Sequence, residues 1–130
     1  MQLSSFLRTV LKLDAASCLA MAALLIGASG LLSPLLGLPV ALLTEAAVLL
    51  VIVGHFILRL GTREQASPIL VRLVVFGNVG WAVASFASLV LLTRITNLGL
   101  ASIVGQAFAV LSFAALEWRG LRESVWASPA

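Results

Sequence analysis

Four long stretches of apolar residues constrain the fold of this chain more than any other feature. They cover residues 13–32, 40–60, 69–92 and 98–116. A helix needs about 20 apolar residues to cross the hydrocarbon core of a bilayer. Apolar side chains surround these stretches on all sides, whereas a soluble helix keeps a polar face. The sequence therefore predicts an all-α integral membrane protein with one transmembrane domain, residues 1–130.

The composition agrees with this prediction. Hydrophobic residues make up 62% of the chain and charged residues only 10%. Soluble domains average about 45–50% apolar and about 25% charged residues. The net charge is +3, but the basic residues flank apolar stretches instead of forming a basic surface with aromatic residues. We therefore expect the lipid bilayer as a partner and no nucleic acid, and we exclude an ordinary soluble enzyme.

Short connections predict how the four helices are arranged. Residues 33–39, 61–67 and 93–97 separate the apolar stretches and contain glycine, proline, serine and threonine. Short connections make consecutive helices antiparallel neighbours, so we expect an up-down-up-down four-helix bundle. Every backbone amide must be satisfied within such spans, which favours helices over strands.

Several residues mark the expected ends of these helices. Ser67 followed by Pro68 is typical of an N-cap and a first helical residue. Asn97 is a candidate N-cap for the last helix. The polar tail from Gly120 onward is expected to fray.

The distribution of basic residues predicts the orientation. Seven of the eight basic residues lie on one side of the predicted spans: Arg8, Lys12, Arg59, Arg63, Arg72, Arg119 and Arg122. Only Arg94 lies on the other side. Such an excess marks the cytoplasmic face, so both termini are predicted to be cytoplasmic. Basic residues before an apolar run also resemble a signal peptide, but the first run is long for one, and we expect a retained helix.

Small residues recur at helical spacing in the last two spans. Gly80, Ala84 and Ser88 follow one another at four-residue intervals in the third, with Gly77 nearby; Ala101, Gly105 and Ala109 do so in the fourth. Small residues allow helices in a membrane to approach closely. We expect at least one of these seams to join the two spans within the chain, and a homo-oligomer interface is the alternative.

Ionisable residues within spans are costly, which makes them candidate functional residues. At about 1.5 Å per residue, His55 lies roughly 6 Å and Asn78 roughly 9 Å from the cytoplasmic surface. Asp14 and Glu117 lie near that surface. These four groups come one from each helix and could converge. For Asp14 and Glu117 we favour a position among the lipid headgroups, paired with basic residues.

The single histidine and the single cysteine limit the available chemistry. His55 alone cannot provide bis-histidine haem ligation, and no spacing of carboxylates indicates a metal site. We expect a neutral His55 that donates to a carbonyl or to Asn78. Cys18 alone forms no intrachain disulfide or redox pair. The sequence therefore predicts no metal, no cofactor and no catalytic residues.

The remaining polar residues within the spans are predicted to join helices. Asn78, Trp81 and Gln106 are expected to form interhelical hydrogen bonds, with Trp81 facing protein. Glu45 and Arg94 are the charged residues of the outer side, and we expect them to form an ion pair. Three aromatic residues near the ends of the predicted spans are expected to lie at the membrane–water interface: Phe6, Trp118 and Trp126.

Several strings resemble an uncharacterised family of small four-span proteins of the bacterial inner membrane. They are Leu36-Gly37-Leu38-Pro39, Gly77-Asn78-Val79-Gly80-Trp81 with Ser85, Gly105-Gln106-Ala107, and Ala115-Leu116-Glu117 with Gly120-Leu121-Arg122. The similarity covers nearly the whole chain. It implies the fold and the location, and it draws attention to Asn78, Trp81, Gln106 and Glu117.

Three functions remain open at this point. The absence of catalytic motifs favours a non-catalytic accessory or structural subunit, in a homo-oligomer or a larger membrane complex. A small oligomeric transporter is one alternative. The other is a lipid- or quinone-binding membrane subunit that uses Asn78, Trp81 and Gln106.

Overall fold

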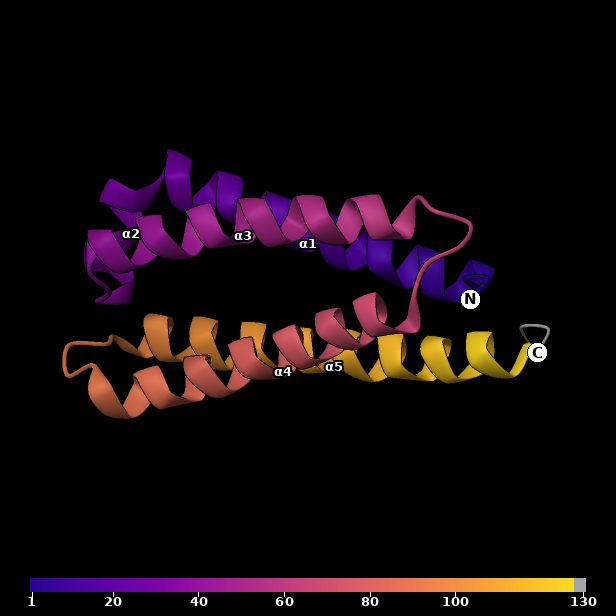
Figure 1. Ribbon diagram of the computed structural model, residues 1–130. Coiled ribbons are helices and arrows are strands. Elements are labelled where there is room, and N and C mark those ends of the chain that lie inside the picture. The colour runs from indigo at the N-terminus through magenta and orange to yellow at the C-terminus, as the bar shows by residue number, and fades with distance from the viewer. Residues whose placement is uncertain (128–130) are drawn as a thin grey trace.

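The chain is all-helical in the computed structural model, which describes the backbone of residues 1–127 and the side chains of residues 1–125. Its described part contains five helices: α1 (Ser5–Gly27), α2 (Ser29–Leu36), α3 (Val40–Gly61), α4 (Pro68–Leu91) and α5 (Asn97–Ala127). All except α2 are long and apolar enough to cross a membrane. The all-α class and the four membrane-length helices of the prediction are therefore confirmed (Figure 1).

The four long helices form two hairpins that lie side by side. One hairpin pairs α1 with α3, and the other pairs α4 with α5 (Figure 1). Contacts between α1 and α5 join the hairpins, whereas α3 and α4 scarcely touch. Both termini lie at one end of the molecule, here named the terminal end. The opposite end, with α2 and the α4–α5 connection, is named the α2 end.

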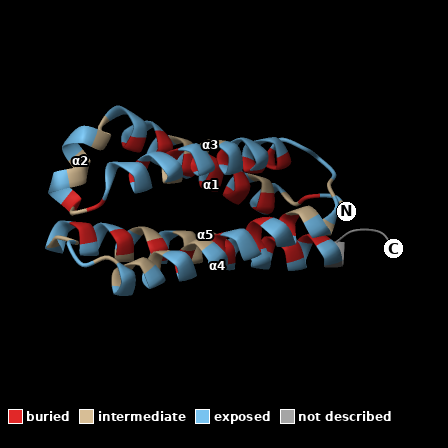
Figure 2. Cartoon of the chain, turned by 60° about the vertical axis from the view of Figure 1, so that its left-hand side comes forward, coloured by how far each residue is buried: buried red, intermediate tan, exposed pale blue. Residues whose placement is uncertain are grey.

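The outward surfaces of both hairpins are apolar. Buried residues gather where helices face one another, while the outer faces are exposed (Figure 2). Val90 is 83% exposed and Ile69 is 69% exposed. Contiguous exposed apolar surface of this kind is unusual in soluble monomers and suits contact with hydrocarbon.

The first helix begins earlier than the sequence predicts. Ser4 caps α1, since its Oγ accepts a hydrogen bond from the Leu7 amide at 3.1 Å. The helix then ends at Gly27, so the predicted span of residues 13–32 is displaced toward the N-terminus. Residues 29–36 form the separate helix α2, which contains Pro34. The prediction of an irregular connection at residues 33–36 is therefore wrong.

The last helix extends well beyond the predicted end at residue 116. It continues to Ala127, and its Leu121 and Ser124 are buried. Ser124 Oγ accepts a hydrogen bond from the Ser4 amide at 3.0 Å, so packing on α1 holds this turn. The predicted fraying from Gly120 is wrong for residues up to 127, and residues 128–130 lie outside the described part.

Hydroxyl side chains cap the starts of α4 and α5. Ser67 caps α4 as predicted, since its Oγ accepts from the Ile69 amide at 3.3 Å, and Pro68 is the first helical residue. At the start of α5 the prediction of Asn97 as cap is wrong. Thr96 takes that role, because its Oγ1 accepts from the Gly99 amide at 3.0 Å.

Backbone hydrogen bonds fasten the two hairpins together at both ends. At the terminal end, the amide of Leu3 donates to the Glu64 carbonyl and the amide of Ala66 to the Met1 carbonyl, both at 2.9 Å. At the α2 end, the Thr96 amide donates to the Leu36 carbonyl at 3.1 Å. Between these fastenings α3 and α4 remain apart.

Gly37 makes the fastening at the α2 end possible. It ends α2 in the left-handed conformation, with φ of 70°, which side chains other than glycine adopt at a cost. A Cβ at this position would also overlap the carbonyl oxygen of Arg94. The absence of a side chain therefore lets the two connections lie against each other.

Candidate functional site

Three polar side chains from three helices meet in the interior. Asp14 of α1 and Glu117 of α5 are 1% and 0% exposed, and Asn78 of α4 is 6% exposed. Asn78 Nδ2 donates to Asp14 Oδ2 at 2.8 Å and to Glu117 Oε1 at 2.8 Å. We name these residues the carboxyl–amide cluster. It links the two hairpins through a single amide group.

Hydrogen bonding within the cluster is incomplete. The Cys18 thiol donates weakly to Asp14 Oδ1, with sulfur and oxygen 3.7 Å apart. Glu117 Oε2 is buried and has no hydrogen-bond partner among the described residues. The carboxyls of Asp14 and Glu117 lie close together, since the same Asn78 Nδ2 group donates to both. The cluster thus contains more acceptors than donors, although buried polar groups are nearly always paired.

The prediction that Asp14 and Glu117 pair with basic residues is wrong, because both are buried inside the protein and bond Asn78. Because α1 begins at Ser5, Asp14 lies in its third turn and not at its edge. Because α5 continues to Ala127, Glu117 lies within that helix and not at its end. The alternative, convergence in the bundle, holds for Asp14, Asn78 and Glu117.

A second group of hydrogen bonds joins α4 to α5. Trp81 Nε1 donates to Gln106 Oε1 at 2.9 Å, and Gln106 Nε2 donates to Ser85 Oγ at 2.7 Å. Ser85 Oγ donates in turn to the Trp81 carbonyl at 2.8 Å. The predicted interhelical hydrogen bonds of Asn78, Trp81 and Gln106 are therefore present.

The small-residue seam of the third span does not pack on α5 as expected. Gly77, Gly80 and Ala84 are exposed and turn toward α3. Gly105, in the seam of α5, is exposed as well, and an added Cβ there or at Gly80 would meet no atom within 4 Å. The larger polar side chains described above fill the contact between the two helices instead.

A groove opens between α3 and α4, with a volume of about 610 Å³. Its walls are mainly aliphatic and aromatic. The residues from α3 are Leu49, Leu50, Ile52, Val53, Phe56 and Ile57, and those from α4 include Leu73, Val74, Gly77, Gly80, Trp81 and Ala84. Cys18 and Asn78 supply polar atoms to the lining. The groove was not predicted, because sequence periodicity does not show which neighbouring helices stay apart.

Asn78 connects the groove to the carboxyl–amide cluster. Both of its hydrogen bonds are donated by Nδ2, so within the described chain its Oδ1 accepts none. The same side chain lines the groove. A molecule in the groove therefore meets hydrocarbon walls and one amide acceptor, with two carboxyls directly behind it.

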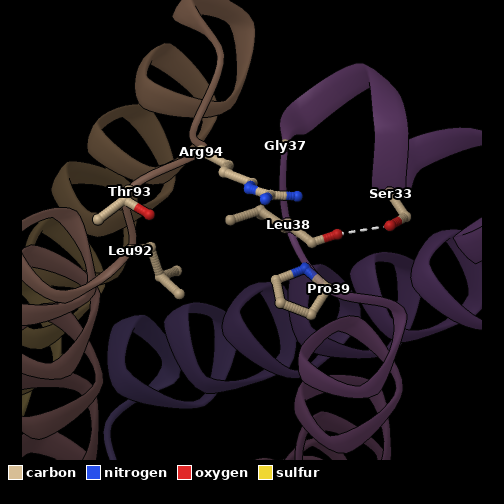
Figure 3. A pocket seen from close by; sticks show the side chains of 7 residues that line it. All are labelled: Ser33, Gly37, Leu38, Pro39, Leu92, Thr93 and Arg94. Carbon is tan, nitrogen blue, oxygen red and sulfur yellow. Dashed lines mark hydrogen bonds between the residues drawn. The ribbon is translucent and has the colours of Figure 1, made fainter.

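A second hollow of about 420 Å³ lies at the α2 end. It is lined by Ser33, Gly37, Leu38, Pro39, Leu92, Thr93 and Arg94 (Figure 3). Ser33 Oγ donates to the Leu38 carbonyl at 2.6 Å, which holds the turn after α2. The Arg94 side chain extends from the α4–α5 connection toward Gly37 and Leu38. We name this hollow the α2-end pocket.

Three predicted site residues lie apart from the cluster. His55 is exposed on α3, and its Nδ1 lies 3.1 Å from the Val51 carbonyl oxygen of the same helix. It bonds a carbonyl as expected but makes no contact with Asn78. Glu45 and Arg94 are both exposed, and the predicted ion pair between them is not present. The ion pair found among the described residues joins Arg119 and Glu123 at 3.2 Å.

No group of three or more metal-ligating side chains occurs in the part of the chain that the structure describes. Comparisons with protein-family models, with curated proteins and with solved structures found no match to this chain.

Proposed function

We propose that this chain is a non-catalytic multi-pass protein of the bacterial inner membrane that acts as an accessory subunit by holding a lipid- or quinone-like molecule in the groove between α3 and α4. The observation that carries the proposal is the groove itself. It is apolar, opens sideways where a bilayer would lie, and has the Asn78 amide in its lining.

The proposed topology follows from charge and from the helices. Four membrane-length helices and the excess of basic residues near the terminal end support an up-down-up-down arrangement with both termini in the cytoplasm. The α2 end then faces the outer side. In this orientation the groove lies at the level of the hydrocarbon core.

The architecture keeps the groove open. Backbone hydrogen bonds fasten the hairpins at both ends, and Gly77 and Gly80 leave space on the α4 wall. Water in such an apolar groove would lack partners. Hydrocarbon is the occupant that a bilayer supplies, and ligand sites of this size are commonly apolar with a few polar groups that orient the ligand.

The proposal assigns binding and no chemistry to the groove. Its polar lining consists of one amide and one thiol, and the thiol donates to Asp14. The Trp81 Nε1 hydrogen is bound to Gln106.

Identification of retained molecules tests the proposal. Protein extracted in mild detergent is washed, and its organic extract is analysed by mass spectrometry beside that of Gly80→Leu, which fills the groove. Gly105→Leu is the matched control, since it adds the same side chain to an equally open helix surface outside the groove. We expect a retained lipid or quinone in the natural protein and Gly105→Leu and its loss in Gly80→Leu. Equal retention in all three would contradict the proposal.

A second candidate function is transport by a small oligomer. The buried carboxyls of Asp14 and Glu117 favour it, because ionisable groups inside membranes often mark ion pathways. Flux of a lipophilic cation in proteoliposomes, lost in Asp14→Asn and in Glu117→Gln, would support this candidate. Flux unaffected by either substitution would exclude these carboxyls from transport.

A further inference from the structure

The two hollows of the structure lie along the same pair of helices. The α2-end pocket is lined by Pro39, directly before α3, and by Leu92, directly after α4. The groove is lined by residues farther along the same helices, beginning at Leu49 and Ala84. At 1.5 Å per residue, these levels are about 12–15 Å apart.

Small residues occupy the interval between the hollows. Ala46 lies one helical turn before Leu50, and Ser88 lies one turn after Ala84. Both are half-buried. Each of the two helices therefore has a small side chain at the level between the hollows, where a hydrocarbon chain would have to pass to reach the groove from the α2 end.

Arg94 places a positive charge at the beginning of this path. It is the basic residue of the α2 end, lines the pocket and extends across it (Figure 3). No hydrogen bond or ion pair of its guanidinium occurs within the described chain. Glu45, the acidic residue nearest this end in sequence, is exposed and forms no ion pair among the described residues. The Arg94 charge is thus available to an anion.

From these features we infer that the groove takes an anionic phospholipid, whose phosphate headgroup lies at Arg94 in the α2-end pocket and whose hydrocarbon chain follows the α3–α4 seam to Trp81. This inference rests on the function proposed above and specifies its ligand. Trp81 lies about 17 Å along α4 from Leu92, close to half of the roughly 30 Å hydrocarbon core. A chain from one leaflet therefore reaches it.

The fluorescence of Trp81 provides the test, because Trp81 lines the groove. A variant with Trp118→Phe and Trp126→Phe keeps Trp81 as the sole tryptophan. It is placed in vesicles that mix an unlabelled phospholipid with dibrominated phosphatidylglycerol, which is anionic, or dibrominated phosphatidylcholine, which is zwitterionic. Bromine on the lipid chain quenches the fluorescence of a tryptophan that it contacts.

We expect the relative affinity from quenching to favour the anionic lipid about fivefold, since one basic residue near the surface contributes about 1 kcal/mol. Arg94→Gln is expected to reduce this preference to about one. Arg59→Gln, at the opposite end of α3, is the matched control and is expected to keep the preference. Equal affinities in the parent variant, or a preference that survives Arg94→Gln, would overturn the inference.

A groove-filling variant separates failure of the inference from failure of the proposed function. Gly80→Leu is expected to lower the quenching of Trp81 by both brominated lipids. If it does so while the two lipids bind equally, the groove binds hydrocarbon and the role of Arg94 is refuted. If Gly80→Leu leaves quenching unchanged, lipid does not occupy the groove and both proposals are refuted.

Discussion

Replacing Asn78 with leucine removes the one amide that bonds both buried carboxyls of the carboxyl–amide cluster. The Nδ2 group of Asn78 donates hydrogen bonds to Asp14 Oδ2 and Glu117 Oε1, both at 2.8 Å. Leucine has a similar size and provides no donor. The substitution therefore leaves two further carboxyl oxygens unpaired, in addition to Glu117 Oε2, which is already unpaired.

The size of the loss follows from this count of oxygens. A buried polar atom left without a partner costs about 1–3 kcal/mol, so two such atoms predict a loss of about 2–6 kcal/mol in the free energy of unfolding. Average interhelical hydrogen bonds in membranes contribute only about 0.6 kcal/mol each, which would predict about 1 kcal/mol. The larger value applies here because both acceptors are carboxyls that are at most 1% exposed.

Equilibrium unfolding in mixed micelles, followed by circular dichroism while the fraction of sodium dodecyl sulfate is raised, measures this loss. Gln106→Leu is the matched control, since it removes an amide that bonds the side chains of Trp81 and Ser85 and the Ile103 carbonyl, at partly buried positions and without a carboxyl partner. We expect Asn78→Leu to lower the free energy of unfolding by at least about 2 kcal/mol and Gln106→Leu by about 1 kcal/mol. Equal losses in the free energy of unfolding would refute the argument that buried carboxyls without hydrogen-bond donors cost more than other unpaired polar groups.

Two further substitutions test separate parts of the structure by the same unfolding assay. Glu117→Gln replaces the unpaired oxygen with an N–H donor that can reach Asp14, so we expect the stability to be kept or raised; a loss above about 1 kcal/mol would contradict the hydrogen-bond pattern of the cluster. Gly37→Ala forces a side chain into a left-handed conformation and against the Arg94 carbonyl, and it is expected to cost about 1–2 kcal/mol or more. Gly30→Ala, in α2 where an added Cβ meets nothing within 4 Å, is its control and is expected to be neutral or stabilising; similar losses for both would refute the role of Gly37.

The sequence was sufficient to predict the number and character of the long helices. Membrane-length apolar runs depend on local composition alone, and the caps at Ser67 and Pro68 depend on neighbouring residues. The ends of α1 and α5 were harder to predict. They are fixed by tertiary contacts, such as the hydrogen bond from the Ser4 amide to Ser124 Oγ, which joins residues 120 positions apart.

The error in the helix ends carried over to the candidate site. The depth of a residue in the membrane depends on where its helix ends, and the sequence predicts helix ends too close to Asp14 and Glu117. The spacing of residues along α1 does indicate which side chains are buried. Leu7, Leu11, Asp14 and Cys18 recur at three- or four-residue intervals, share one face of the helix and are all buried. Treating Asp14 as a member of that face would have placed it in the interior.

The sequence does not predict how closely two neighbouring helices pack. Short connections predict that consecutive helices are neighbours, yet α3 and α4 scarcely touch and the groove lies between them. The fastenings at the two ends, which depend on backbone groups of Leu3, Glu64, Leu36 and Thr96, hold this spacing. Backbone hydrogen bonds of irregular segments leave no pattern of side-chain types by which they could be predicted.

Thiol labelling tests most directly whether hydrocarbon surrounds the outward faces of the helices. In a Cys18→Ala background, single cysteines replace Val48, 53% exposed, Val83, 63% exposed, and Phe108, 60% exposed; a cysteine at the exposed Thr62 of the α3–α4 connection is the control. In membrane vesicles permeabilised so that a water-soluble maleimide reaches both sides, the maleimide is expected to label the cysteine at position 62 and none of the other three. Rapid labelling at positions 48, 83 and 108 would show that water, and not lipid, contacts these faces and would contradict the account.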